Sequence, residues 1–262
     1  MMRSLVAIAT ALVAAGVAPA LAQQGPPVPA LLEPTFLLAT PRIVEGDDFR
    51  GEGEILGSTR ELAIRDQSLT APDRVFVPRT LRGRLLAPGD VVQFYRIERV
   101  LTDPWTGERL GRLLRPTGIG SVDSIAEDVA RVRLTHGFHP VQIGDYARAV
   151  EQADTLVTVR SGPAPAVAEG PVVASPDDQA LLPPFERIFL RTTRPHELSP
   201  GDEVAIDRPG EVVNGARLPD VPIARAMVVR VEGRIVAAVI TEMMRSDLIP
   251  GDRFRHEDPP AE

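Results

Sequence analysis

Short runs that alternate between apolar and polar residues occupy most of the chain, and they predict β-strands rather than helices. Val75–Val77, Val91–Ile97 and Ile188–Leu190 combine β-branched or aromatic residues with flanking charges. Pairs of strands are expected within 120–134 and 226–240. No segment shows the 3.6-residue period of a long amphipathic helix. We therefore expect an all-β fold, with at most one helical turn between the strands, at Ser124–Val129.

Several elements occur twice in the same order, which indicates two copies of one small β domain. The copies are separated by near-constant offsets of 117, 113, 112 and 107 residues: Gly53–Ser58 and Gly170–Ser175, Asp73–Val77 and Glu186–Leu190, Leu86–Val91 and Leu198–Glu203, Gln142–Asp145 and Ile249–Asp252. Each copy offers about six short strands joined by turns rich in glycine, proline and aspartate. This spacing is typical of small barrels or sandwiches.

Proline, glycine and aspartate fall at corresponding turns of both copies. Proline presets φ for a turn, glycine accepts the positive φ that a type II turn requires, and aspartate bonds nearby backbone N–H groups. We interpret the following residues as structural turn residues, not as catalytic groups: Pro88, Gly89, Asp90, Gly144, Asp145, Pro200, Gly201, Asp202, Gly251 and Asp252. The pattern Asn214–Gly215 predicts a further hairpin.

Changes in composition divide the chain into six parts. Residues 1–22 resemble a secretory signal peptide, with Arg3 before an apolar run and Ala20–Ala22 as the cleavage site. An uncleaved anchor is the alternative, but the apolar run is shorter than the ~20 residues of a spanning helix. The remaining parts are an extended segment (23–52), in which Thr35–Ala39 is a strand or a docking segment, then β domain 1 (53–150), a Pro/Ala-rich linker (151–169), β domain 2 (170–256) and a disordered tail (257–262).

Composition excludes several classes of protein. The chain has no cysteine, so disulfide scaffolds, thiolate metal sites and cysteine nucleophiles are excluded. All 29 basic residues are arginine, and the net charge of −7 argues against nucleic acid as a partner. Aromatic residues make up 4%, too few for stacking platforms. The mature chain is expected not to span a membrane.

Candidate chemistry is sparse, and we expect no catalytic residues, no cofactor and no metal. Asp103, Trp105 and Glu108 lie in one loop, where the only tryptophan is either a contact anchor or a cap of the barrel. His136 and His139 form the only close histidine pair. Together with Asp145 they define the alternative of a glycan-acting enzyme site, although a solvated loop explains the pair more simply.

The repeat resembles the region that follows the LysM module in bacterial LysM peptidoglycan-binding envelope proteins. The resemblance covers about residues 36–256 and rests on the order of short motifs: Phe36–Val44, Asp73–Val77, Pro88–Asp90, Phe94–Arg96, Asp103–Gly111, Gly144–Asp145, Leu198–Asp202 and Ile249–Asp252. In the family a LysM module precedes this region, and residues 23–35 are too few for one. Direct glycan binding is therefore not implied by the resemblance.

These observations lead to a functional expectation. The chain is expected to be a non-catalytic periplasmic protein that binds or scaffolds components of the cell envelope, with an envelope protein or peptidoglycan as partner. A component of an envelope assembly, such as a flagellar or secretion ring, is the second possibility. The enzyme or enzyme accessory with a His136/His139 site is the third.

Overall fold

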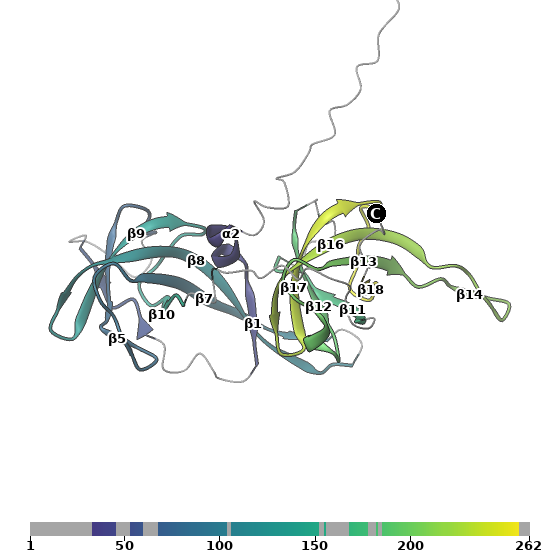
Figure 1. Ribbon diagram of the computed structural model, residues 1–262, viewed down its shortest axis with the longest axis horizontal. Coiled ribbons are helices and arrows are strands. Elements are labelled where there is room, and N and C mark those ends of the chain that lie inside the picture. The colour runs from purple at the N-terminus through teal and green to yellow at the C-terminus, as the bar shows by residue number, and fades with distance from the viewer. Residues whose placement is uncertain are drawn as a thin grey trace, which may run out of the picture.

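The computed structural model describes residues 33–45, 53–59, 68–103, 106–151, 155, 168–177, 182 and 185–256. The predicted signal peptide, most of the predicted linker and the predicted tail lie outside these residues. The described chain is mainly β, so the all-β fold is confirmed. Two β units lie side by side and are joined through an N-terminal segment (Figure 1). We call residues 53–151 unit 1 and residues 168–256 unit 2.

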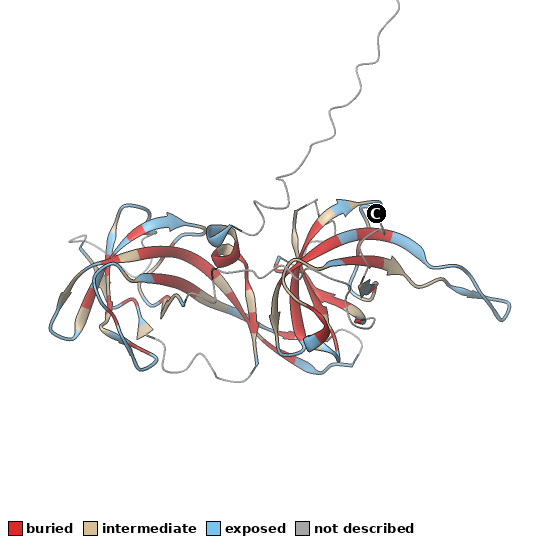
Figure 2. Cartoon of the chain, in the orientation of Figure 1, coloured by how far each residue is buried: buried red, intermediate tan, exposed pale blue. Residues whose placement is uncertain are grey.

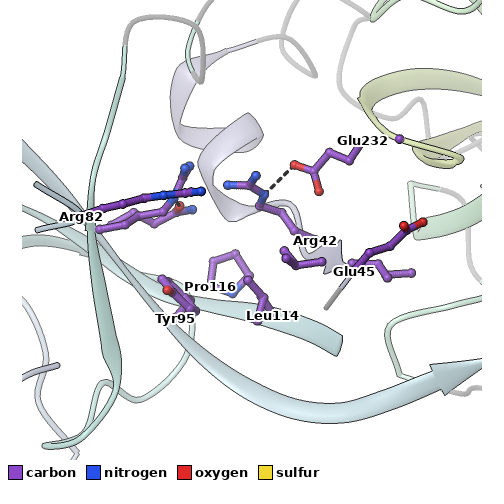
Figure 3. A pocket seen from close by; sticks show the side chains of 12 residues that line it. Arg42, Glu45, Arg82, Tyr95, Leu114, Pro116 and Glu232 are labelled. Carbon is purple, nitrogen blue, oxygen red and sulfur yellow. Dashed lines mark hydrogen bonds and ion pairs between the residues drawn. The ribbon is translucent and has the colours of Figure 1, made fainter. Parts of the chain in front are cut away.

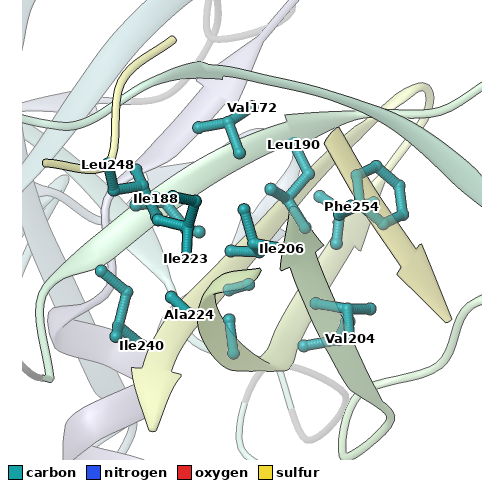
Figure 4. Packing of buried hydrophobic residues seen from close by; sticks show 14 of the residues in the cluster. Val172, Ile188, Leu190, Val204, Ile206, Ile223, Ala224, Ile240, Leu248 and Phe254 are labelled. Carbon is teal, nitrogen blue, oxygen red and sulfur yellow. The ribbon is translucent and has the colours of Figure 1, made fainter. Parts of the chain in front are cut away.

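Unit 2 is a closed barrel of six antiparallel strands in the order β11-β12-β17-β16-β13-β18. The strands are β11 (Glu169–Ala174), β12 (Arg187–Arg191), β13 (Glu203–Arg208), β16 (Val221–Glu232), β17 (Ile235–Met243) and β18 (Arg253–His256). Their inward aliphatic side chains and Phe254 fill the interior (Figure 4). A 3-10 turn (η2, Pro195–Glu197) precedes β13, and the hairpin β14 (Val212–Val213)–β15 (Ala216–Arg217) extends from the barrel.

Unit 1 is a curled sheet in the order β3-β4-β9-β8-β7-β10-β2, and β1 pairs with β8 beside it. Read in this direction, β4, β9, β8, β7 and β10 correspond to β12, β17, β16, β13 and β18 of unit 2. The strands are β2 (Gly53–Glu54), β3 (Gly57–Ser58), β4 (Arg74–Pro78), β7 (Val91–Thr102), β8 (Arg109–Ala126), β9 (Val129–Gly137) and β10 (Tyr146–Ala149), with the side hairpin β5 (Thr80–Leu81)–β6 (Arg84–Leu85). Only Ile55 and Leu56 separate β2 from β3, and their amides donate to the carbonyls of Asp145 and Phe76. Together β2 and β3 thus take the place that β11 has in unit 2.

The turns of the two units are alike in atomic detail. The glycine amide and the aspartate carbonyl of each turn bond one residue on an adjacent strand: Gly89 and Asp90 bond Val122, Gly201 and Asp202 bond Val228, Gly144 and Asp145 bond Ile55, and Gly251 and Asp252 bond Val172. All four glycines have φ between 92° and 105°. Each aspartate carboxylate also accepts the amide three residues before it.

The N-terminal segment packs between the units rather than extending away from them. Residues Pro34–Ala39 form a short helix, α2, and Arg42–Val44 form strand β1, which pairs with β8. The strand considered for Thr35–Ala39 is therefore wrong, and the docking segment is correct. Proline at the first helical position suits a helix start. The adjacent residues Leu37 and Leu38 are both buried, and Leu37 lies in the core between the units.

A separate hydrophobic core lies between the units and is shared by both. It combines Leu37 and Ile43 of the N-terminal segment, Leu101, Leu110 and Leu113 of the β7–β8 hairpin, and Val173, Ala174, Phe189, Met227, Val229, Ile235, Ala237 and Val239 of unit 2. Neighbouring residues such as Ile188, Ala238 and Ile240 point into the barrel instead. Strands β12 and β17 are thus buried on both faces, which explains their nearly continuous apolar runs (Figure 2).

One local expectation is contradicted. Residues Ser124–Val129 do not contain a helical turn: β8 runs to Ala126, and Glu127–Asp128 form a tight turn into β9. Glu127 has a φ of 51°, which matches the twist of a two-residue hairpin. The hairpin predicted at Asn214–Gly215 is confirmed, with φ values of 51° and 83°.

Candidate functional site

The loop that the sequence suggested as a contact anchor lies against unit 2. Asp103 is 1% exposed, and its carboxylate is 2.8 Å from Nη1 of Arg191. Glu108 pairs with Arg191 at 3.1 Å and with Arg234 at 2.6 Å. Trp105 lies outside the described residues. The acidic side chains of this loop therefore meet arginines of the same chain and connect the β7–β8 hairpin to unit 2.

Further polar contacts join the units beside the shared core. Arg115 of β8 binds Asp177 at 2.5 Å, and Arg99 of β7 donates to the carbonyls of Ser175 and Pro176 at 3.3 and 3.1 Å. Arg187 of unit 2 lies 4.6 Å from the ring centre of Phe36 in α2. Charged contacts thus surround an apolar centre, as they do in stable interfaces.

The histidines do not form a shared site with Asp145. His136 lies on β9, and His139 follows in the next turn, where burial lowers its pKa and Arg115 lowers it further. The carboxylate of Asp145 is buried and accepts Nε and Nη2 of Arg96 at 2.8 and 3.0 Å. Within the part of the chain that the structure describes, no three His, Asp or Glu side chains could hold a metal ion together.

A pocket of about 310 Å³ lies where the N-terminal segment, unit 1 and unit 2 meet. We call it the inter-unit cleft, and it is lined by Arg42, Ile43, Val44, Glu45, Arg82, Gln93, Tyr95, Leu114, Pro116, Arg148, Glu232 and Gly233. Figure 3 shows the side chain of Arg82 extending toward Arg42, with Tyr95, Pro116 and Leu114 on one wall. Its size is at the lower end of the range of small-molecule sites.

Two of the arginines in the cleft have defined partners. Nε of Arg42 is 2.6 Å from Oε1 of Glu232, which also lies 3.6 Å from Nη1 of Arg230. Arg148 donates from Nε to Oε1 of Gln93 at 2.6 Å, and Gln93 in turn donates to the carbonyl of Leu38 in α2. Unit 1, the N-terminal segment and the β16–β17 turn are therefore connected through the wall of the cleft.

Arg82 reaches the cleft from a strained turn. The turn Arg82–Gly83 between β5 and β6 has φ values of 47° and 78°, the geometry of a type I′ turn. The first position of this turn favours asparagine, aspartate or glycine, and a left-handed arginine costs about 1–2 kcal/mol. The Asn214–Gly215 hairpin has the favoured residues at the same two positions. Among the described residues, Arg82 has no ion-pair partner.

Tyr95 contributes a buried hydroxyl to the same wall. The residue is 2% exposed, and its ring stacks on Tyr146 with centroids 5.6 Å apart. No described residue hydrogen-bonds its hydroxyl. Leaving such a group without a hydrogen bond inside a protein costs about 1–3 kcal/mol. Among the described residues, the exposed Arg82 thus has no ionic partner, and the buried Tyr95 hydroxyl has no hydrogen-bond acceptor.

Sequence reasoning missed the cleft because its residues come from separate segments spread between residues 42 and 233. One local signal was present, since Leu81-Arg82-Gly83-Arg84 has a glycine where a two-residue hairpin needs positive φ. That pattern predicts the turn, but it does not indicate which wall Arg82 would face.

None of the helices in the described residues is long and apolar enough to span a bilayer. No family model matches the chain, and no curated protein matches its sequence.

Proposed function

We propose that this chain is a non-catalytic protein of the bacterial cell envelope that binds or scaffolds other envelope components. The export signal expected at residues 1–22 and the resemblance to LysM-associated regions support an envelope location. The proposed partner is an envelope protein or peptidoglycan.

The observation that carries the proposal is the apolar core shared by the two units. Binding proteins and scaffolds need surfaces at fixed positions relative to each other. Two flexibly linked modules must be ordered when they bind one partner, and the entropy lost in that ordering weakens the affinity. Here the units are joined by buried side chains such as Ile43, Leu113 and Phe189, and charged contacts lie beside them. The buried acids Asp145 and Asp252 are each held by an arginine fork, which suits a structural role.

A pull-down of residues 23–262 tests the proposal, on purified peptidoglycan sacculi and, in parallel, on envelope extract. We expect saturable retention on one of the two, without release of soluble sugar or peptide from the sacculi. Retention on sacculi would identify peptidoglycan as the partner. Capture of one envelope protein at a fixed ratio would identify a protein scaffold.

A matched pair of variants makes this experiment specific. Ile43→Asp places a charge in the shared core, where Ile43 is 3% exposed, and should reduce retention. Val91→Asp makes a similar change at a residue that is 39% exposed, and should retain binding. Hydrolysis of sacculi by the wild-type chain, abolished by a single side-chain substitution, would contradict the non-catalytic proposal.

A second candidate function is that of a subunit in an envelope assembly, which the β14–β15 hairpin favours. This hairpin projects away from unit 2 (Figure 1). It exposes Val212, Val213 and Leu218 by 69%, 46% and 48%. A projecting hairpin with exposed valines can add to a strand edge of another chain. The proposed occupant of that contact is a second copy of this chain.

Sedimentation velocity over a range of concentrations tests this candidate. The wild-type chain should associate as concentration rises, and the double variant Val212→Asp/Val213→Asp should remain monomeric. A wild-type chain that stays monomeric at all concentrations would exclude self-assembly through the hairpin.

A further inference from the structure

The inter-unit cleft has the features of a binding site for an anion. Arg82 points into it from a turn at which asparagine or glycine would be less strained. Residues kept in unfavourable backbone conformations often mark functional positions. Arg82 therefore has a local cost and no described ionic partner that would offset it.

A tyrosine beside the cleft supplies a hydrogen-bond donor. Tyr95 lines the cleft, and its hydroxyl is buried and bonded by no described residue. A tyrosine hydroxyl can donate to an anionic oxygen, and the bond is strengthened where water is excluded. Arg82 in the β5–β6 turn and Tyr95 on β7 are thus two donor residues of unit 1 that line the same pocket (Figure 3).

The charges of the lining residues favour a monoanion. Three guanidiniums, those of Arg42, Arg82 and Arg148, face two carboxylates, those of Glu45 and Glu232, which leaves one positive charge. A phosphate dianion would be repelled by the carboxylates after the single excess charge had been neutralised. A carboxylate carries one charge and matches the planar fork of arginine.

The apolar residues that line the cleft indicate which chemical group lies next to the carboxylate in the ligand. Ile43, Leu114 and Pro116 supply aliphatic surface beside the polar groups. An aliphatic side chain next to the carboxylate, as at the C-terminus of a short peptide, would cover this surface. A sugar acid shares the carboxylate but has hydroxyl groups where the wall is apolar.

We propose that the inter-unit cleft binds a small organic carboxylate, with Arg82 and Tyr95 as its principal donors and an aliphatic group of the ligand against Leu114 and Pro116. This site is independent of the proposed scaffolding function, because it concerns a soluble ligand and not the partner of the whole protein. The absence of retention in the pull-down would contradict the scaffolding function but not the proposed carboxylate site. The absence of binding in the ligand titration would contradict the carboxylate site but not the scaffolding function.

The test is an NMR titration of residues 23–262 with N-acetyl-alanyl-alanine. Its C-terminal methylamide, glucuronate and inorganic phosphate serve as comparison ligands. We expect saturable shifts with the dipeptide acid, weaker binding of glucuronate and none of the methylamide. Tighter binding of glucuronate than of the dipeptide would overturn the proposed aliphatic contact with Leu114 and Pro116. Binding of the methylamide or of phosphate as tight as that of the dipeptide would overturn the proposal.

Two variants assign the donors. Arg82→Asn should weaken dipeptide binding about 10-fold or more, since a charge-assisted bond is lost. The same change should raise the melting temperature, because asparagine accepts the left-handed turn more readily. Tyr95→Phe keeps the ring stack and should weaken binding about 3- to 10-fold through loss of one hydrogen bond.

Arg131→Asn is the matched control, since Arg131 is an exposed arginine on β9 outside the cleft. It should leave the dissociation constant unchanged. Equal affinities of the wild type, Arg82→Asn and Tyr95→Phe would overturn the assignment of these donors. A loss of binding with Arg131→Asn as large as with Arg82→Asn would do the same, because it would indicate attraction by overall charge only.

Discussion

At the scale of single residues, the two units repeat a buried ion pair as well as a turn. Arg96 of β7 and Arg208 of β13 occupy corresponding strands. Each places Nε 2.8 Å and Nη2 3.0 Å from the carboxylate of its turn aspartate, Asp145 or Asp252. Those aspartates are 3% and 1% exposed. The arginine neutralises the aspartate carboxylate, and the same carboxylate accepts a backbone amide of the turn. One arginine therefore both compensates the buried charge and supports the turn conformation.

Removal of either arginine should therefore destabilise its own unit. We predict that Arg208→Ala and Arg96→Ala each lower the free energy of unfolding by about 2–4 kcal/mol, because a buried carboxylate loses its partner while the arginine itself was partly exposed. Urea denaturation measures the effect. Arg131→Ala is the control, with an expected change within about 0.5 kcal/mol at a surface site. A loss of similar size in the control would contradict the structural role of the fork.

The outer carboxylate of the same cluster should make stability depend on pH. Hydrogen bonding to Arg208 lowers the pKa of Asp247 below its ordinary value of 3.8. A carboxyl with a depressed folded-state pKa stabilises the fold above its unfolded-state value, and that stability is lost as pH falls through the folded-state value. The wild type should thus exceed Asp247→Asn in stability at pH 7. Urea denaturation at pH 7, 5 and 3 should show that the difference in unfolding free energy between the wild type and Asp247→Asn decreases only toward pH 3. A difference that is the same at all three pH values would contradict an ion pair that depends on the ionised Asp247 carboxylate.

The sequence predicted the turn aspartates but not their arginines, for a physical reason. A turn aspartate bonds an amide three residues away, so a short motif contains the whole interaction. Arg96 and Arg208 lie 49 and 44 residues from their partners. Only the closure of the sheet brings these pairs together, and no local spacing indicates it. For the same reason Arg82 and Tyr95 could not be grouped into one site beforehand.

At the scale of elements, glycine positions show how closely the strands approach. A Cβ at Gly170 in β11 would overlap the carbonyl oxygen of Arg191 on the neighbouring strand. At Gly57 in β3 a Cβ would meet nothing within 4 Å. The repeat aligns Gly57 with Ala174 of unit 2, so unit 2 already has an alanine at that position.

Alanine at these two glycines should have opposite effects. Gly170→Ala should lower the melting temperature, because the backbone of Arg191 must shift to admit the methyl group. Gly57→Ala should leave stability unchanged or raise it by about 0.5–1 kcal/mol, since glycine in a strand carries an entropic cost. Differential scanning calorimetry measures both. Equal, small effects at the two sites would contradict the close packing of β11 against β12.

The strands were predictable from their alternation, but α2 was not. Six residues are too few for helical periodicity to emerge, and Phe36-Leu-Leu38 fits a strand equally well. Its helical form depends on tertiary packing, since Leu37 is buried in the core between the units, and Gln93 bonds the carbonyl of Leu38. Short helices of this kind gain most of their stability from such contacts.

At the scale of the whole molecule, the proposed scaffold and the inter-unit cleft both require the two units to form one rigid body. The repeat in the sequence predicted two units, but it left open whether they pack together. Both units bury side chains in the shared core, and the N-terminal segment supplies Leu37 and Ile43 to it. The inter-unit cleft exists only while the units keep this arrangement, because Glu232 and Gly233 come from unit 2 and Tyr95 comes from unit 1.

A distance measurement between the units tests this most directly. The chain has no cysteine, so Arg133→Cys on β9 and Glu203→Cys on β13 can each carry a single spin label. Pulsed electron spin resonance should give one narrow distance distribution, which Ile43→Asp should broaden. A broad distribution in the otherwise unchanged chain would mean that the units move independently on their linker, and would contradict the fixed two-unit body.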